Sequence, residues 1–491
     1  AGIARPDFKD LGVTGNEPVA SVAADSRQIT KEDLFIAVEG FETDGHDYIG
    51  HALDRGAVAV IAQKNPDNKP CVIQVSDSRR CMADIAAAFF ETPSKNMTLV
   101  GITGTNGKTT TSFILESIFT TAGFSTGVIG TVNIRYNGRS IDNPVTTPDS
   151  IDLQKNLHEM KQAGVTHVVM EVSSHGLDLY RVDGCDFDAG IFTNLTQDHL
   201  DYHKDMDDYF NCKKRFFTHL LVNRQDKAAA PAIINIDDSY GNQLATSLDE
   251  PVIRISTRTS ADLNPVETTD DINGLCATIH HGNSTFDFKS ELTGTFNLEN
   301  ILCAAGAALA LGIKKEHIQA GIENCRIIPG RLEKIPNAIN RYLFVDYAHT
   351  PDALDSVLQT LKLRAPEKLI CVFGCGGDRD KTKRPKMGQM ALKHSDLVII
   401  TSDNPRTENP DRIISDITAG LDSFTRIDEN QLQQSLLQPG YLIEPDRRSA
   451  IQKAMQLSRP KDIIIVAGKG HETYQITNSG TIHFDDRIEL D

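Results

Sequence analysis

Short apolar runs that end in glycine or a polar residue alternate with helical stretches along most of the chain. The run TLVGITG (98–104) predicts a strand, and KTTTSFILESIFTTAG (108–123) predicts the helix that follows it. Further strands are predicted at 33–40, 56–63, 70–76, 164–174, 187–195, 229–237, 341–349, 368–377, 395–404 and 461–470, and further helices at 80–93 and 296–312. Continuous apolar strands that alternate with helices indicate an α/β fold with parallel, doubly wound sheets.

The chain is too long for a single core. Its 491 residues suggest two to four domains. A polar stretch at 94–98 is a candidate linker, and a boundary is expected within 327–337, where prolines and a glycine interrupt the alternation.

Composition and charge exclude several classes of function. The formal net charge is -17 and the pI is near 5.3, which argues against wholesale binding to nucleic acid or anionic membranes. No run of 18 apolar residues predicts a transmembrane helix. Residues 1–13 lack the basic and apolar regions of a signal peptide, and the nine cysteines are scattered, so we expect free thiols in a reducing cytoplasm.

The segment GITGTNGKTTT (101–111) has the composition of a phosphate-binding loop but not the usual spacing. In the form G-x-x-x-x-G-K-[ST], counting back from Lys108 places the first glycine at Ile102. The segment nevertheless connects a predicted strand to a helix, so its N–H groups and the helix N-terminus are expected to face phosphate oxygens. Lys108 is predicted to reach the β- and γ-phosphates and Thr109 or Thr110 to bind Mg²⁺. A glycine-rich turn without a ligand is the alternative.

Two further segments carry carboxylates and imidazoles next to predicted strands. Glu171 lies at the end of the strand 164–174, a position suited to Mg²⁺, and a buried structural Glu is the alternative. Asp198, His199, Asp201 and His203 crowd the segment 192–217 just after another strand. This cluster also fits a polar loop that enters an amphipathic helix, with Asp201 and His203 in structural roles.

Four polar segments in the C-terminal third begin at predicted strand ends or just beyond them. They lie at 345–354, 373–385, 402–410 and 467–475. The second combines glycines with Arg379, Lys381, Lys383 and Arg384, so it is a candidate anion site in an otherwise acidic chain. Any one of these segments also fits a solvated loop, but four at neighbouring strand ends indicate a binding site.

Together these motifs resemble the Mur ligase family, the ATP-dependent amide-forming enzymes of bacterial peptidoglycan precursor synthesis. TGTNGKTT (103–110) is similar to the loop of that family, whose glycine placement accounts for the unusual spacing. The resemblance extends over nearly the whole chain through DSR, TTPDS, EVSSHGL, FTNL, DHLDYH, TGTFNLENILCAA, DYAHTPDAL, FGCGGDRDKTKRP, DNPR and AGKGHE. At 179–181 the usual Q-x-R of the family reads Leu-Tyr-Arg.

The resemblance implies three domains: a UDP-substrate-binding domain at 1–95, a central ATP-binding domain at 96–331 and a C-terminal Rossmann-like domain for the incoming amino acid at 332–491. The implied reaction is ATP-dependent amide formation between the D-Glu carboxylate of UDP-N-acetylmuramoyl-L-Ala-D-Glu and meso-2,6-diaminopimelate, through an acyl phosphate. DNPR resembles family members that add diaminopimelate. The cofactors are ATP and Mg²⁺, and we expect a cytoplasmic monomer without nucleic-acid partners or membrane insertion.

The resemblance also implies the site residues. Those for catalysis are Lys108, Glu171, His199 and Lys213. Those for ATP are Gly104, Thr105, Asn106, Gly107, Lys108, Thr109, Thr110, Asn297, Asn300, Arg331, Asp346 and His349. Those for the UDP-substrate are Ser26, Thr146, Thr147, Ser173 and Arg181. Those for diaminopimelate are Arg379, Asp403, Asn404, Pro405, Arg406, Gly468 and Glu472. Those for the metal are Thr109, Glu171, His199 and, as a carbamate, Lys213.

Other functions share parts of this pattern. The same ligase chemistry with L-lysine is one alternative, and a folylpolyglutamate-synthetase-like ligase is another, although DSR and DNPR are not expected there. A phosphate-loop kinase and a nucleotide switch without catalysis are more distant alternatives. Phosphate release that requires both a carboxylate acceptor and an amine separates a ligase from the last two.

Overall fold

The computed structural model describes residues 18–65, 67–69, 71–222, 228–249, 251–338, 341–364, 367–427 and 439–490. The chain divides into two compact units, one made of Ala1–Gly101, Phe124–Gly190 and Cys212–Ala230, the other of Ile102–Gly123, Ile191–Asn211 and Pro231–Asp491. Among the described helices, none has the length and apolar character needed to cross a membrane. Residues 1–13, examined above for a signal peptide, lie outside the described residues.

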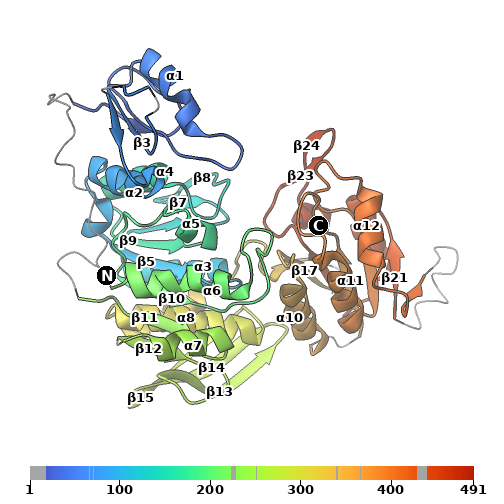
Figure 1. Ribbon diagram of the computed structural model, residues 1–491. Helices are drawn as coiled ribbons and strands as arrows, with labels where there is room; N and C mark the ends of the chain where they lie inside the picture. Colours follow the sequence, from blue (N-terminus) through green and yellow to red (C-terminus); the bar gives the residue numbers. More distant parts are fainter. Residues whose placement is uncertain are drawn as a thin grey trace. The chain divides into compact units, whose positions relative to one another are not determined.

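The first part of the described chain is a small parallel sheet in the order β1-β2-β3-β4. Figure 1 labels β3 and α1 of this part. Its elements are β1 (Val22–Ala23), β2 (Leu34–Ile36), α1 (Ile49–Asp54), β3 (Ala59–Ala62), β4 (Val72–Gln74) and α2 (Ser78–Phe89). The three predicted strands are confirmed. The predicted helix is confirmed too, but it ends at Phe89 before Pro93, because the residue before a proline avoids the helical region and Thr92 has φ 45°.

An eleven-stranded sheet follows, in the order β15-β14-β13-β12-β11-β10-β5-β9-β6-β7-β8. Its strands are β5 (Thr98–Thr103), β6 (Thr126–Ile129), β7 (Ile134–Tyr136), β8 (Arg139–Ile141), β9 (His167–Glu171), β10 (Ala189–Phe192), β11 (Ala232–Asn235), β12 (Val252–Ile255), β13 (Leu263–Asp271), β14 (Gly274–His281) and β15 (Ser284–Ser290). Pairs such as β6–β9 and β11–β12 are parallel, as predicted.

Both edges of this sheet are antiparallel, which the sequence analysis did not predict. Strands β13, β14 and β15 form one antiparallel edge, and β6, β7 and β8 form the other (Figure 1). Buried and exposed positions alternate along β15, so one face of this edge is open to solvent. A search for continuous apolar runs does not detect strands of this kind.

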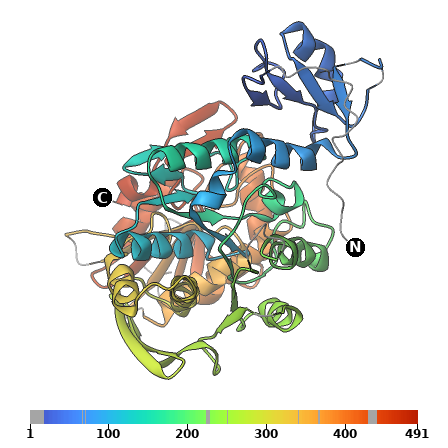
Figure 2. The ribbon, with the colours of Figure 1, turned by 90° about the vertical axis from the view of Figure 1, so that its left-hand side faces the viewer.

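Several helices pack against one another within each unit. They are α3 (Lys108–Thr121), α4 (Ser150–Gln162), α5 (Ser174–Asp178), α6 (Met206–Arg215), α7 (Ser239–Ser247), α8 (Thr295–Ala310) and α9 (Lys315–Asn324). In the first unit, α2 and α4 lie side by side (Figure 2). In the second unit, α3 packs against α8 and α9, which anchors the helix that follows the predicted phosphate loop.

The C-terminal part contains a seven-stranded sheet in the order β16-β17-β22-β18-β19-β21-β20, parallel except for β16. Its strands are β16 (Glu333–Ile335), β17 (Tyr342–Asp346), β18 (Leu369–Phe373), β19 (Leu397–Ile400), β20 (Thr425–Arg426), β21 (Gly440–Ile443) and β22 (Ile463–Ala467). A separate hairpin joins β23 (Tyr474–Thr477) to β24 (Gly480–His483), and the helices are α10 (Pro351–Lys362), α11 (Lys383–His394), α12 (Pro410–Thr418), α14 (Arg447–Leu457) and α15 (Asp486–Leu490).

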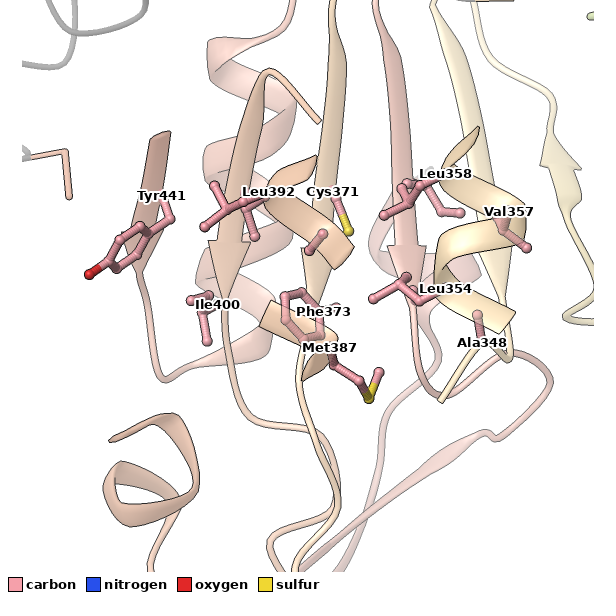
Figure 3. Close-up of a cluster of buried hydrophobic side chains, with 14 of the residues drawn as sticks. Ala348, Leu354, Val357, Leu358, Cys371, Phe373, Met387, Leu392, Ile400 and Tyr441 are labelled. Atoms are coloured by element: carbon pink, nitrogen blue, oxygen red, sulfur yellow. The ribbon is translucent and has the colours of Figure 1, made fainter. Parts of the chain in front are cut away.

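A hydrophobic cluster lies on each face of this sheet. On one face, Leu354 and Leu358 of α10 and Met387 of α11 pack near Phe373 and Ile400 of the sheet (Figure 3). The other face packs against α14 and α15. The rigid sheet places the loops at the carboxyl ends of β17, β22, β18 and β19 at one edge, where open parallel sheets bind ligands.

Candidate active site

The predicted phosphate loop is the turn between β5 and α3. Gly104 (φ 146°) and Gly107 (φ 88°) both have left-handed backbone conformations. A Cβ atom on Gly107 would lie only 2.2 Å from Asn300 Oδ1. The Nζ atom of Lys108 donates to the carbonyl oxygens of Gly104 at 2.9 Å and Thr105 at 2.8 Å. The loop therefore has the close backbone turn and the cation that phosphate oxygens require.

The segment after β10 holds this loop in place. Thr193 Oγ1 donates to the carbonyl oxygen of Asn106 at 2.6 Å, and Asn194 Oδ1 accepts from the Asn106 N–H at 2.9 Å. The backbone carbonyl of Asn194 accepts from the N–H of Thr105, and Thr105 Oγ1 lies 3.1 Å from the Tyr209 hydroxyl. No role was predicted from the sequence for Thr193, Asn194 or Tyr209.

Helix α8 and the residue Arg331 bring side chains to the same loop. Asn297 and Asn300 are buried, and Asn297 Nδ2 donates to the Thr293 carbonyl at 2.8 Å. Asn300 lies against Gly107, as described above. Arg331 Nη2 donates to Thr109 Oγ1 at 3.0 Å. The structure thus brings Asn300 and Arg331 to the phosphate loop, while Asn297 supports Asn300 through a 3.4 Å hydrogen bond.

Asp346 is the last residue of β17, and His349 lies in the loop that follows. Asp346 is buried, and its carboxylate accepts from the N–H groups of Leu332 at 2.6 Å and Ala348 at 2.7 Å. Burial raises the pKa of Asp346, and the nearby Arg331 opposes that rise. His349 Nδ1 lies 2.9 Å from the Tyr347 carbonyl, and burial lowers the pKa of His349. A neutral His349 that donates from Nδ1 keeps Nε2 as an acceptor.

In the first unit, Glu171 ends β9 as predicted and is 1% exposed. Its Oε2 atom accepts from Thr131 Oγ1 at 2.8 Å, and Oε1 accepts from the Thr131 N–H at 3.2 Å. A Cβ atom on Gly130 would lie 2.3 Å from Glu171 Oε1, so the glycine leaves room for the carboxylate. Thr131 lies outside every motif quoted from the sequence, so no role was predicted for it.

The residues predicted for the UDP-substrate divide into two groups. Thr147 Oγ1 donates to the Glu171 carbonyl at 2.9 Å, and the Ser173 N–H donates to Thr147 Oγ1 at 3.0 Å. Arg181 Nη1 donates to the Thr147 carbonyl at 2.7 Å. Thr146 joins this group through Thr131, whose Oγ1 lies 3.1 Å from Thr146 Oγ1. Ser26 forms the second group, because its Oγ lies 3.1 Å from His51 Nδ1 in the N-terminal sheet.

Two predicted metal or catalytic residues lie before α6 and in its last turn. His199 has φ 55°, a strained value for a residue with a side chain, and its Nε2 lies 3.5 Å from Asp198 Oδ2. Lys213 on α6 is only 1% exposed. His203 is buried with Nδ1 3.2 Å from Asp208 Oδ2, which fits the structural role considered for it.

Arg406 is the last residue of the DNPR segment. It has φ 53°, and its Nη1 atom donates to the carbonyl oxygens of Gly377 at 2.8 Å and Asn404 at 3.4 Å. A Cβ atom on Gly376 would lie 2.9 Å from Arg406 Nη1 and 3.8 Å from Arg379 Cγ. The structure therefore brings both predicted arginines to the same glycine. Arg379 is exposed, whereas Arg406 is half-buried.

A hydrogen-bonded cluster lies beside the DNPR segment. Asn404 Nδ2 donates to Glu472 Oε2 at 2.8 Å, and Lys469 Nζ lies 3.7 Å from Asp403 Oδ1. Gly468 has φ 114°, and a Cβ atom there would lie 2.5 Å from Asp403 Oδ2. Pro405, also predicted for this site, is buried. No role was predicted from the sequence for Lys469.

The proposed metal residues belong to both compact units: Thr109 and His199 to one, Glu171 and Lys213 to the other. Within the ranges that the structure describes, no three His, Cys, Asp or Glu side chains group as metal ligands. Among Thr109, Glu171, His199 and Lys213, only Glu171 and His199 are of these types, so this set relies on a hydroxyl and a modified lysine. It remains a prediction.

Comparison with known proteins identifies the class. Models of the Mur ligase family match three successive regions: the catalytic domain at residues 18–90, the middle domain at 102–308 and the glutamate ligase domain at 330–470. The chain is 45% identical over 477 residues to a protein of Geobacter metallireducens, covering 96% of this chain and 93% of that one. The chain belongs to the Mur ligase family.

The names of the relatives are specific. The Geobacter metallireducens protein is a UDP-N-acetylmuramoyl-L-alanyl-D-glutamate–2,6-diaminopimelate ligase. A solved structure with that name is 33% identical, with a TM-score of 0.69 over 96% of this chain and 94% of that chain. The Mycobacterium tuberculosis folylpolyglutamate synthase is 17% identical, with a TM-score of 0.64 over 79% of this chain and 92% of that chain, so it shares the fold.

Proposed function

We propose that the chain is an ATP-dependent ligase that joins meso-2,6-diaminopimelate to the D-Glu carboxylate of UDP-N-acetylmuramoyl-L-Ala-D-Glu in peptidoglycan precursor synthesis. The observation that carries the proposal is the cluster of Arg406, Asn404 and Glu472 at the carboxyl edge of the C-terminal sheet, in a chain 45% identical to a ligase of that name. Soluble phosphorylated substrates of this kind suit a cytoplasmic enzyme, and we propose that it acts as a monomer.

The chemistry requires activation of the carboxylate. A carboxylate oxygen attacks the γ-phosphorus of ATP and ADP leaves, which gives an acyl phosphate. The amine of the amino acid attacks the acyl carbon, the tetrahedral intermediate expels phosphate, and the amine loses a proton to form the amide. The first step brings two anions together, so Lys108 and the N–H groups of the phosphate loop have to stabilise the transferred phosphoryl group.

The residues of the loop fit nucleotide and metal. Gly107 turns close to Asn300, and Lys108 extends over the loop from the start of α3. Mg²⁺ would supply charge neutralisation at the transferred phosphate. Thr109 and Glu171 would hold one Mg²⁺, and His199 and Lys213, the latter as a carbamate, would help to hold a second. Glu171 is already fixed by Thr131, so its carboxylate has a defined orientation.

Burial supports carbamylation of Lys213. The Lys213 side chain is 1% exposed, whereas its neighbour Lys214 is half-buried on the same helix. Adjacent helical side chains point about 100° apart, so only one of the two faces inward. Carbamylation converts a buried cation into an anionic oxygen ligand, which a metal close to phosphate groups favours.

Lys213 is expected to give a carbamate signal in ¹³C NMR of the enzyme equilibrated with ¹³C-bicarbonate. The signal should disappear in Lys213→Ala and persist in Lys214→Ala, which serves as the matched control. We also expect kcat of Lys213→Ala to fall at least ~100-fold, the scale for loss of an electrostatic stabiliser. A wild-type enzyme that is fully active without a carbamate signal contradicts this assignment.

The wild-type enzyme is expected to use meso-diaminopimelate with a much higher kcat/KM than L-lysine. The measurement is phosphate release with ATP and the UDP-dipeptide, with either amine or none. Turnover should require both the dipeptide and an amine. Equal use of L-lysine would favour the lysine-adding alternative, and turnover with a folate substrate in place of the dipeptide would favour the folylpolyglutamate-synthetase-like one.

A further inference from the structure

Lys469 is a buried cation inside the proposed amino-acid pocket. It follows β22 in the segment AGKGHE, and its side chain is 0% exposed. The Nζ atom donates to Asn404 Oδ1 at 3.1 Å and to Glu472 Oε2 at 3.2 Å, and it lies 3.7 Å from Asp403 Oδ1. Lysine is almost never fully buried unless it is paired. Its partners here are three residues proposed to bind the amino acid.

Lys469 selects the orientation of the Asn404 amide. The Oδ1 atom of Asn404 accepts from Lys469 Nζ and from the Ile476 N–H at 2.9 Å, two groups that only donate. The Nδ2 atom must therefore point the other way, where it donates to Glu472 Oε2. Among the described residues, the hydrogen bonds to the Glu472 side chain both end on Oε2, so Oε1 is left to accept from a ligand.

Lys469 also balances the charge of the pocket. Asp403 and Glu472 contribute two carboxylates, and Lys469 contributes an ammonium group close to both of them. Burial raises the pKa of Glu472 and repulsion by Asp403 adds to the rise, whereas Lys469 and the Asn404 hydrogen bond oppose it. Without Lys469, burial and repulsion by Asp403 raise the pKa of Glu472 further and favour its protonated form. A protonated Glu472 attracts an ammonium group only weakly.

We propose that Lys469 is a positioning residue for substrate selection: it holds Glu472 ionised and Asn404 oriented, so that the pocket takes an amino acid with a second ammonium group at its far end. This inference rests on the proposed function, because it deepens the assignment of the same pocket. The acceptor in direct contact with that ammonium is Glu472, and Lys469 acts through it.

The test compares meso-diaminopimelate with 2-aminopimelate of the same configuration at the reacting centre, which lacks only the far ammonium. In Lys469→Met, we expect the ratio of the two kcat/KM values to fall at least ~10-fold, through a higher KM for diaminopimelate. The kcat/KM for 2-aminopimelate and the KM for ATP should stay within about three-fold of wild type. Lys469→Arg keeps the positive charge. Its ratio of kcat/KM for diaminopimelate to kcat/KM for 2-aminopimelate should therefore stay closer to wild type than that of Lys469→Met.

Lys461→Met is the matched control, because Lys461 is an exposed lysine in the same part of the chain. The ratio of the two kcat/KM values in this variant should equal that of wild type. If Lys469→Met does not fold, the same ratio of kcat/KM values is measured in Lys469→Gln. Glutamine keeps a hydrogen-bond donor at this position and removes the charge. Equal losses for both amines, or an unchanged ratio in the folded variant, overturn the role of Lys469. Wild-type enzyme that cannot use diaminopimelate overturns the proposed function instead.

Discussion

Replacing Glu171 with glutamine is expected to lower kcat at least ~100-fold, the usual scale for loss of one electrostatic stabiliser. Glutamine has the shape of glutamate, so it fits beside Gly130, and its amide can still hydrogen-bond to Thr131. What the variant loses is the negative charge at the end of β9. If Glu171 helps to hold Mg²⁺, the loss appears in the chemical step rather than in folding.

Two measurements separate this expectation from a structural effect. Thermal unfolding should show that the folded state of Glu171→Gln survives, and raising the Mg²⁺ concentration should recover part of the lost rate. Glu323→Gln, the same substitution at an exposed position on α9, should leave kcat unchanged. A kcat for Glu171→Gln within a factor of three of wild type removes Glu171 from the proposed metal site.

The fold was predictable where strands are fully buried. The parallel strands β17, β18, β19 and β22 are buried along almost their whole length, and such runs are visible in a single sequence. The antiparallel edge β13–β15 was not predicted, because its alternating positions resemble ordinary polar loops. A continuous apolar run in the sequence indicates a strand that is buried on both faces. A strand with one solvated face alternates polar and apolar residues, so it is harder to recognise from sequence.

The candidate site was predictable where a motif is contiguous and not where a contact spans the sequence. Lys108 and Arg406 stand in recognisable segments, and the structure gives both of them specific hydrogen bonds. Thr131 was missed because its contact with Glu171 joins residues 40 positions apart. Lys469 was missed for another reason: a lysine in a loop is usually solvated, and only the structure shows that this one is buried.

The amine preference depends most on Arg406. Diaminopimelate is lysine with an additional carboxylate at its far end, and the planar guanidinium can hold a carboxylate with two parallel hydrogen bonds. In the described part of the chain, both hydrogen bonds of the Arg406 side chain run from Nη1, so Nη2 and Nε can donate to a ligand carboxylate. The strained φ of 53° shows that the surrounding structure, rather than local preference, fixes this residue.

Arg406→Ala is therefore expected to abolish most of the preference for meso-diaminopimelate over L-lysine. A site built for a polar group rejects an analogue that lacks it by up to ~10⁴–10⁵-fold, because the site group stays desolvated and unpaired. Without the guanidinium, that penalty for L-lysine disappears and so does the attraction for the far carboxylate. We expect the ratio of the two kcat/KM values in the variant to be within ~10-fold of unity.

Two companion variants make the result specific to the guanidinium. Arg406→Gly removes the side chain and also the backbone strain, because glycine adopts a φ near 53° without cost, and it should lose the preference as Arg406→Ala does. Arg412→Ala, at an exposed position on α12, should keep the wild-type ratio. A full preference for diaminopimelate in Arg406→Ala would assign recognition of the far carboxylate to another residue, and Arg379, beside the same glycine, would be the next to test.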